Sequence, residues 1–509
     1  MTKLRTSIVL LIALAAFGLG VRPAFSQGAE TMEDRLNGLS DSLQLLVDRY
    51  DAPGLAVAVV ADGQIVYAEG FGHENVEEGR PVTDRSLFGI GSVVKTFTSA
   101  LTGALIGDGA IDLEGRPGDY VTGLSFGAED LERNLRISHL LSHTSGLADM
   151  AGSTVVFPET TQVLLAPRFA HFEAACRVGD CWTYNNINFM LLDMVAEAVT
   201  GQSKITLFAE RLLEPAGMAH SVSSTEAFLA SPHAVRGYGL VGEDLVPVAY
   251  ENLFGEHVYA TAPDLARWLM MWMHGGLAGE RQVVPQAYAR QALSMQAIEN
   301  GAPPSPDAPN DYLYGYGYGW NVKSMDGHYT VSHGGNENGF SAHVLGVPAE
   351  AVGVVALTNQ QGSILPNLVT DYVIHLLLDL PATDLMSYPV VVGQVDAVLS
   401  AEEARLSPVP NDPMTIAPFD LVGRYSAAGY GTVEVAFADD RLTLVTPLAH
   451  FALRHLGGNR FGLGITAPLP AGMNASYFVA AFNEEEGEAT SMSINLASEP
   501  VRFDRVEPR

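Results

Sequence analysis

Two groups of β-rich runs lie far apart in this chain, and their separation constrains the fold more than any other feature. The first group, GLAVAVVADGQIVYAEGFG (54–72), holds two runs joined around an Asp-Gly pair that is typical of hairpin turns. The second group, HYTVSHGG, FSAHVLGV and VGVVALTN, lies between residues 328 and 359. The pattern between about residues 84 and 295 is mainly helical. A sheet built from both ends of one domain, in antiparallel order, is therefore predicted.

Helices should cover this sheet, and a second domain should follow it. An amphipathic pattern at 30–50 and an apolar pattern at about 363–380 predict two covering helices. The first domain, residues 30–380, is thus an α/β domain whose antiparallel sheet is flanked by helices and carries a helical insertion. Residues 381–418 are rich in proline and indicate a linker. Short, partly alternating runs in 419–509, among them GTVEVAF and RLTLVTP, predict a small C-terminal all-β domain.

The first residues carry the features of a cleaved secretory signal. Lys3 and Arg5 give a basic start, an apolar run extends from Ile8 to Leu19, and small residues follow it. Residues 1–26 are therefore interpreted as a signal peptide, and the mature protein is expected in the periplasm or secreted. Later stretches lack the length and apolar character of a membrane span, so no integral span is expected after signal cleavage.

The two cysteines fit an exported protein. Cys176 and Cys181 lie close together in CRVGDC. In an oxidising compartment such a pair can form a short-loop disulfide, and the sequence leaves open whether it does.

Composition excludes some classes of partner. The 509 residues include 28 Lys and Arg against 58 Asp and Glu, a formal charge of -30. Such a protein repels nucleic acid and anionic membrane surfaces. A small-molecule or peptide substrate is the expected partner, no cofactor is expected, and the oligomeric state stays open.

The stretch GIGSVVKTF (89–97) places a lysine in an otherwise apolar helix pattern. Apolar residues recur at spacings of three and four as far as Leu105, so a helix is predicted to start at Ser92. Residues three apart share one face of a helix, which sets the Lys95 amine beside the Ser92 hydroxyl. The pair suits a nucleophile and its base, although an N-cap serine followed by a snorkelling lysine gives the same pattern.

Three short motifs together resemble those of the penicillin-recognising serine hydrolases. They are Ser92-Val93-Val94-Lys95, Tyr184-Asn185-Asn186 and His333-Gly334-Gly335. This family includes class C β-lactamases, D,D-peptidases, D-aminopeptidases and related esterases. The resemblance covers about residues 30–380, including ISHLLSHTSGL and YGYGWNV, and implies a β-lactamase/D,D-peptidase-like fold. The region from about Phe419 resembles a C-terminal module that is often attached to these enzymes.

Two of the motifs have competitors elsewhere in the chain. A second Tyr-x-Asn begins at Tyr250 and a second His-Gly-Gly begins at His274. Tyr184 is preferred because it follows a turn and precedes an amphipathic helix, whereas Tyr250 is expected in a loop. His333 is preferred because it is expected at the end of a strand, whereas His274 ends a helical pattern as an ordinary C-terminal cap.

The resemblance implies a role for each motif residue. Ser92 would attack a carbonyl carbon, while Lys95 and Tyr184 share the removal of its proton. Asn186 would hold the substrate amide and the lysine amine, and the backbone N–H groups of Ser92 and Asn336 would stabilise the oxyanion. The predicted catalytic residues are Ser92, Lys95 and Tyr184; the predicted substrate-binding residues are Asn186, His333, Asn336 and the pair Gly334 and Gly335, which lets the strand approach the substrate.

One departure from the family pattern bears on the substrate. Many peptidases and β-lactamases of the family carry Lys-Thr-Gly or Lys-Ser-Gly on this strand, where the lysine and the hydroxyl help to bind a carboxylate. Gly334 has no hydroxyl, and a histidine is mostly neutral above its ordinary pKa of about 6.5. Weaker carboxylate recognition is therefore expected, with a gain as His333 becomes charged at lower pH. This favours an aminopeptidase-like amidase or an esterase.

Other tempting residues have ordinary explanations. His139 and His143 are four apart, like a zinc-binding pair on a helix, but no glutamate follows the first histidine, and no metal site is predicted. They are expected to hold a loop by hydrogen bonds. The tyrosine-rich stretch DYLYGYGYGW (311–320) either lines a substrate cleft or forms the strand and turn that lead to His333.

These patterns predict an exported serine hydrolase that forms an acyl-enzyme on Ser92. Its expected substrates are small amides or esters, with peptides that contain D-residues as the leading class. An esterase or weak β-lactamase of the same fold is the first alternative. A non-catalytic penicillin-binding or sensor protein is the alternative from another class, and the presence of all three motifs favours the enzyme.

Overall fold

The computed structural model describes residues 32–148, 166–241, 244–248, 258–301, 303, 313–337, 339–381, 408–409, 411–438, 440–446, 450–465, 478–496 and 500–506. The predicted signal peptide and most of the predicted linker lie outside these residues. Among the described helices, none has the length and apolar character that crossing a membrane requires.

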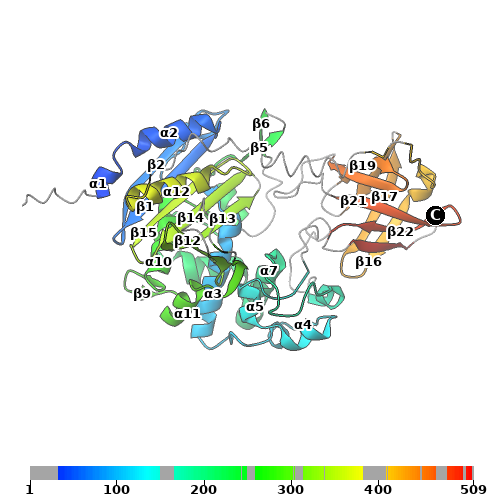
Figure 1. Ribbon diagram of the computed structural model, residues 1–509, viewed down its shortest axis with the longest axis horizontal. Helices are drawn as coiled ribbons and strands as arrows, with labels where there is room; N and C mark the ends of the chain where they lie inside the picture. The colour runs from blue at the N-terminus through cyan, green and yellow to red at the C-terminus, as the bar shows by residue number, and fades with distance from the viewer. Residues whose placement is uncertain are drawn as a thin grey trace, which may run out of the picture.

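A nine-stranded antiparallel sheet forms the centre of the first domain (Figure 1). Its order is β10 (Ala297–Asn300), β11 (Tyr314–Tyr316), β12 (Asn321–Met325), β13 (His328–Glu337), β14 (Phe340–Val347), β15 (Val352–Thr358), β1 (Gly54–Ala61), β2 (Gln64–Asn75) and β3 (Arg80–Pro81). Shorter pairs are β4 (Phe88–Gly89) with β7 (Tyr259–Ala260), β5 (Tyr238–Val241) with β6 (Asp244–Pro247), and β8 (Leu277–Ala278) with β9 (Arg281–Gln282).

Strand β1 joins the two ends of the domain. All of its residues are buried, as expected for a run of Val, Ala and Leu that is covered on both faces. On one side it pairs with β2 through a hairpin, and on the other it pairs with β15, with Leu55 opposite Thr358. The prediction of an antiparallel sheet built from both ends of the domain is confirmed.

Helices cover both faces of this sheet (Figure 1). One face packs against α2 (Leu39–Arg49) and α12 (Leu365–Leu377), the two covering helices that the sequence predicts. The other face packs against α10 (Ala262–Met273). The other α-helices in the described part of the chain are α1 (Met32–Arg35), α3 (Val94–Gly107), α4 (Glu129–Asn134), α5 (Ile137–Leu141), α7 (Asn186–Thr200), α8 (Lys204–Phe208), α9 (Thr225–Ala230) and α11 (Gln286–Ala292).

Helix α3 lies in the interior of the domain. A 3₁₀ turn, Gly91–Val93, precedes it, so the α-helix begins two residues later than the sequence predicts. The side chains from Lys95 to Leu105 are buried, and the ring of Phe97 stacks on Trp268 at 3.9 Å between centroids. Burial on all sides explains why this helix has few polar residues. The buried Lys95 amine therefore needs a hydrogen-bond partner inside the protein.

The C-terminal region is a closed eight-stranded barrel, which confirms the predicted all-β domain. Its strands are β16 (Gly423–Ala427), β17 (Gly431–Ala438), β18 (Arg441–Val445), β19 (His450–Gly457), β20 (Arg460–Ile465), β21 (Val479–Glu485), β22 (Glu488–Ile494) and β23 (Val501–Arg505). The turn between β16 and β17 touches the first domain, where Tyr430 packs on Phe172 with ring centroids 5.8 Å apart.

Candidate active site

A cleft of about 530 Å³ lies over the start of α3, the segment before α7 and strand β13. It is lined by Ser92, Trp182, Tyr184, Glu299, Tyr314, Asn321, His333, Gly334, Gly335, Asn336, Ser341, Ala342, Gly362, Ser363 and Asn367. The cleft thus brings together residues from all three motifs, which are about 90 and 150 positions apart in the chain.

Ser92 and Lys95 form the pair that their spacing predicts. The Lys95 Nζ donates a hydrogen bond to Ser92 Oγ at 3.0 Å. Lys95 is 5% exposed, and its Nζ lies 4.8 Å from the centroid of the Tyr184 ring and 5.7 Å from that of Phe189. The snorkelling alternative is therefore wrong, because the amine ends in the protein interior, against the serine hydroxyl. Ser92 also does not act as a side-chain cap of the helix.

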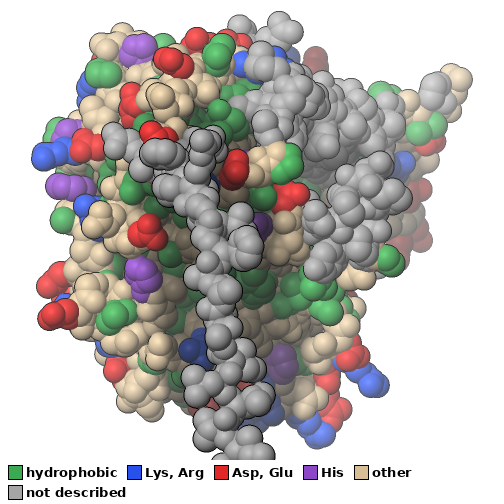
Figure 2. Space-filling model, turned by 60° about the vertical axis from the view of Figure 1, so that its left-hand side comes forward, with side chains coloured by type: hydrophobic (Ala, Val, Ile, Leu, Met, Phe, Trp, Pro, Cys, Tyr) green, Lys and Arg blue, Asp and Glu red, His purple; other side chains and the backbone are tan. Residues whose placement is uncertain are grey.

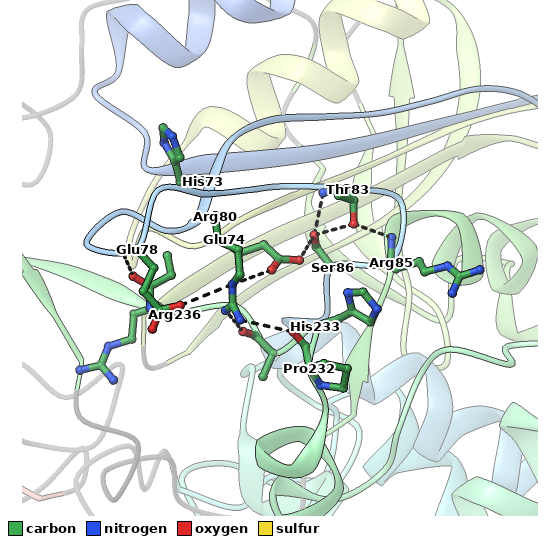
Figure 3. A network of polar contacts seen from close by, with 12 residues as sticks. His73, Glu74, Glu78, Arg80, Thr83, Arg85, Ser86, Pro232, His233 and Arg236 are labelled. Carbon is green, nitrogen blue, oxygen red and sulfur yellow. Dashed lines mark hydrogen bonds and ion pairs between the residues drawn. The ribbon is translucent and has the colours of Figure 1, made fainter.

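The segment that leads to Ser92 is anchored to strand β2 (Figure 3). The buried Glu74 carboxylate accepts a hydrogen bond from Ser86 Oγ at 2.5 Å and lies 3.1 Å from Arg80 Nε. Arg80 also donates to the Ala234 carbonyl at 3.1 Å, and Leu87 N donates to the His233 carbonyl at 2.9 Å. These contacts fix the chain a few residues before the nucleophile.

A disulfide and a buried histidine set the position of Tyr184. Cys176 and Cys181 are bonded, which closes the short loop just before Trp182. His143 then holds the backbone of the residues on either side of the tyrosine: its carbonyl accepts from Thr183 N at 3.0 Å, and its Nδ1 accepts from Asn185 N at 3.2 Å. The His143 ring also packs on the Tyr184 ring, 4.5 Å between centroids.

The environment of His143 fixes its protonation state. Burial lowers its pKa well below the ordinary value, and the nearby charge of Lys95 acts in the same direction. Nδ1 accepts from Asn185 N, so the single proton of the neutral ring sits on Nε2. The expectation that His143 holds a loop by hydrogen bonds is confirmed, and the loop is the one that carries the candidate base Tyr184. His139 was expected to hold a loop by hydrogen bonds, and its Nδ1 accepts a hydrogen bond from Arg136 N, just before α5.

The two asparagines of the second motif have different settings. Asn185 is buried at the N-cap of α7, where its side chain accepts from Ile187 N and donates to the Ala148 carbonyl at 2.8 Å. Asn186 is exposed at the first turn, and among the described contacts no hydrogen bond links it to Lys95. Its predicted contact with the lysine is thus not made in this structure, whereas its contact with a substrate stays a prediction.

His333 lies inside strand β13, which continues to Glu337, so the expectation that it ends a strand is wrong. Its Nδ1 donates to the Gly334 carbonyl at 2.7 Å, and its Nε2 therefore accepts from the Tyr316 hydroxyl at 3.0 Å. Burial lowers the pKa of His333 to about 3, and the Lys95 charge adds to this shift. The expectation of a charge gained near pH 6.5 is wrong, because the imidazole is 2% exposed and both of its nitrogens are already used.

The glycine pair of β13 behaves unequally. A Cβ on Gly335 would overlap the Ile90 carbonyl oxygen and lie 3.3 Å from Ser92 N, so this glycine is what lets the strand touch the nucleophile turn. A Cβ on Gly334 would meet nothing closer than 3.7 Å. Gly91, with φ +49, is also close to this strand: a Cβ on it would lie 2.5 Å from Asn336 N, so the two predicted oxyanion donors are on facing backbones.

The competing motifs fall elsewhere. His274 is the C-cap of α10, as predicted, and Tyr250 lies outside the described residues. The tyrosine-rich stretch has both of the roles considered for it: Tyr314 lines the cleft, and β11 leads through a turn towards β12 and β13. Glu299, which also lines the cleft, was not singled out from the sequence, because it has no local motif.

The antiparallel sheet flanked by helices, with its helical insertion, is a fold of the β-lactamase and D,D-peptidase type. The Ser92–Lys95 pair lies at the cleft of this fold. A family model described as Beta-lactamase matches residues 39–379. The chain therefore belongs to the Beta-lactamase family, whose members are generally serine hydrolases.

Similar proteins agree with this assignment. The chain is 29% identical over 402 residues to Penicillin-binding protein 4 of Amycolatopsis lactamdurans, covering 75% of this chain and 97% of that protein. It is 26% identical over 340 residues to a D-aminopeptidase of Gluconobacter oxydans (strain 621H), covering 64% of this chain and 59% of that protein. The octameric penicillin-binding protein homologue from Pyrococcus abyssi shares the fold, with a TM-score of 0.61 and 20% identity over 92% of this chain and 100% of that chain.

Proposed function

We propose that this protein is an exported serine hydrolase that forms an acyl-enzyme on Ser92 and cleaves small amides or esters, with D-amino-acid peptides favoured. The observation that carries the proposal is the 3.0 Å contact between Lys95 Nζ and Ser92 Oγ at the floor of a cleft. An unassisted serine hydroxyl is a poor nucleophile, and a buried amine within hydrogen-bond distance is the base it requires.

The geometry supports a two-step reaction. Ser92 Oγ attacks the substrate carbonyl carbon as its proton passes to the Lys95 and Tyr184 pair, and the oxyanion faces the backbone N–H groups of Ser92 and Asn336. The bond from the carbonyl carbon to the leaving nitrogen or oxygen then breaks, and the same proton goes to the leaving group. In the second step, water attacks the carbonyl carbon of the acyl-enzyme. The bond to Ser92 Oγ breaks, the acid is released, and a proton from the water restores the hydroxyl.

The strand opposite the nucleophile supports substrates that do not depend on a carboxylate. His333 is neutral and bonded to Tyr316, and Gly334 offers no hydroxyl, so β13 provides no positive charge at the position where carboxylate-binding relatives have lysine. The name of one relative, a D-aminopeptidase, fits this choice, while the name of another, Penicillin-binding protein 4, keeps penicillin-type acylation in view. An esterase or a weak β-lactamase is the alternative within the same chemistry.

Export is the second part of the proposal. The predicted signal at residues 1–26 supports it, as does the bond between Cys176 and Cys181, since disulfides persist mainly in oxidising compartments.

Labelling at Ser92 tests the proposal. A fluorophosphonate or a penicillin should label the wild type, and Ser92→Ala should abolish the adduct. Ser363→Ala is the matched control, since this serine also lines the cleft and should leave labelling intact. Persistent labelling of Ser92→Ala at another serine would sink the assignment.

A hydrolysis panel then separates an enzyme from a binding or sensor protein. The panel contains D-aminoacyl amides, acyl esters and a chromogenic cephalosporin. Repeated turnover that depends on Ser92 supports the enzyme, whereas one acylation event without turnover supports the non-catalytic alternative.

A further inference from the structure

Glu299 lies at the edge of the sheet in a β-bulge. In the pairing of β10 with β11, Ile298 stands opposite Gly315 and Asn300 opposite Tyr314, so Glu299 is the extra residue of β10. Bulges occur often at sheet edges beside active sites, where they redirect a side chain. Here the redirected side chain lines the cleft that contains Ser92.

Glu299 is also the one charged side chain among the described residues that line this cleft, since His333 is held neutral. No ion pair or hydrogen bond of the Glu299 side chain is present in the described part of the chain. Burial alone raises the pKa of its carboxyl, and no positive neighbour offsets the loss of solvation. Aromatic residues lie around it at the same cleft: Trp182, Tyr184 and Tyr314.

Glu299 lies close to the candidate proton donor. Tyr314 feels the charges of both Glu299 and Tyr184, each of which adds to the rise that burial causes in its pKa, so these three groups lie close together. Tyr184 passes a proton to the leaving group in the proposed reaction, whereas the oxyanion faces the backbone N–H groups of Ser92 and Asn336. The leaving group is therefore expected on the side of the cleft that holds Tyr184 and Glu299.

We propose that Glu299, with the rings of Trp182, Tyr184 and Tyr314, forms a subsite for a positively charged group on the leaving portion of the substrate. This inference rests on the proposed hydrolase function and deepens it by naming the chemistry of the substrate. A carboxylate attracts an ammonium group across the cleft, and aromatic faces add a cation–π attraction.

The same subsite explains which substrates are disfavoured. A leaving group that ends in a carboxylate, such as the terminal residue released by a carboxypeptidase, would meet the negative charge of Glu299. The formal charge of -30, with acidic side chains spread over the face in Figure 2, also draws cations towards the protein at low ionic strength. Neutral peptide amides and esters lie between these extremes.

The test uses a charged probe and its neutral isostere. Acetylthiocholine carries a quaternary ammonium in its leaving group, and 3,3-dimethylbutyl thioacetate replaces the nitrogen by carbon. In both cases the acetyl group moves to Ser92 Oγ, the carbon–sulfur bond breaks, and the thiol leaves with the proton. The measured quantity is the ratio of kcat/KM for the charged ester to that for the neutral ester.

Glu299→Gln should lower this ratio about tenfold or more, because it removes the charge and keeps the shape. Glu280→Gln is the matched control: it makes the same change in net charge at an exposed turn between β8 and β9 and should leave the ratio unchanged. Added salt should lower the ratio in the wild type and in Glu280→Gln more than in Glu299→Gln. If Glu299→Gln keeps the ratio of the wild type, the subsite is disproved while the hydrolase stands.

A binding measurement separates failure of the subsite from failure of the function. Choline is titrated calorimetrically into Ser92→Ala and into Ser92→Ala with Glu299→Gln, neither of which needs to turn over. Binding that is at least several-fold weaker in the double variant supports the subsite, even if hydrolysis in the wild type proves independent of Ser92. Equal binding, or no binding to either protein, overturns it.

Discussion

At the scale of single residues, the position of Lys95 explains most of the proposed chemistry. Its amine contacts Ser92 Oγ and faces the rings of Tyr184 and Phe189, so one side of the group is polar and the other aromatic. The charge of this amine also contributes to the lowered pKa values of His143 and His333. Burial is the larger cause of both shifts and the lysine charge adds to it, so both imidazoles beside the proposed nucleophile are neutral.

Lys95 and Tyr184 should act as a coupled pair. Lys95→Ala and Tyr184→Phe should each lower kcat about a hundredfold or more, because each removes one member of the shared proton path. The double variant should lose far less than the product of the two losses. Steady-state kinetics on a neutral ester measures all three variants, and losses that multiply cleanly would contradict a shared path.

His143 should matter for the placement of Tyr184. His143→Ala removes the Nδ1 acceptor and the ring that packs on the tyrosine, and we expect kcat to fall about tenfold or more. His139→Ala is the control. His139 lies four residues before His143 and accepts one described hydrogen bond, from Arg136 N, so this variant should keep kcat within about twofold. His143→Asn, whose side-chain oxygen can still accept from Asn185 N, should recover part of the loss. If His143→Ala and His139→Ala behave alike, the histidine merely fills space.

At the scale of elements, strand β13 and the 3₁₀ turn before α3 must meet without side chains between them. Gly335 lies against the Ile90 carbonyl, and Gly91 lies against Asn336 N. This backbone contact aligns the two predicted oxyanion donors, and it depends on strand and turn being packed from both sides. The disulfide closes the loop before Trp182, and the polar contacts of Glu74 hold the segment before Ser92.

The two glycines of β13 should respond differently to one added methyl group. Gly335→Ala should lower the rate of fluorophosphonate labelling about a hundredfold or more, because the strand must move away from the Ser92 turn. Gly334→Ala should label at nearly the wild-type rate, since its Cβ meets nothing within 3.7 Å. Thermal unfolding of both variants checks that they fold. Equal labelling rates would show that the close approach has no part in acylation.

At the scale of the whole molecule, three buried histidines link stability to pH. Burial lowers the pKa of His333 and of His343 to about 3, and that of His143 well below its ordinary value. The unfolded chain binds these protons near pH 6.5 and the folded protein does not. Their contribution to stability is therefore complete above pH 6.5 and is lost as the pH falls below it towards 3.

His343→Gln should make the protein less sensitive to acid. The glutamine can keep a hydrogen bond to Thr370 but takes up no proton, so the loss in unfolding free energy between pH 7 and pH 5 should shrink by about 2 kcal/mol. Urea unfolding followed by tryptophan fluorescence reports on the first domain, since all four tryptophans lie there. Protonation of surface carboxylates affects both proteins alike and cancels in the comparison. The same acid sensitivity in both would contradict the linkage.

The sequence by itself determined what depends on local spacing. Helical periodicity put Lys95 one turn from Ser92, alternation and turn residues marked the strands that build the sheet and the barrel, and the residues before α7 placed Tyr184 at a helix start. Each of these follows from interactions between residues a few positions apart, and such interactions can be read from the order of residues alone. The roles of Ser92, Lys95, Tyr184 and the other motif residues in catalysis stay predictions.

Only the tertiary structure decided the electrostatic state and the outline of the cleft. A histidine pattern cannot show that His333 is buried and bonded to Tyr316, so its pKa was expected near 6.5 and lies near 3. Nor can a local sequence pattern show that Asn186 makes no hydrogen bond with Lys95 among the described contacts, or that a bulge in an edge strand brings Glu299 to the cleft that contains Ser92. Solvation and charge depend on which distant segments pack together, and that packing is a property of the folded chain as a whole.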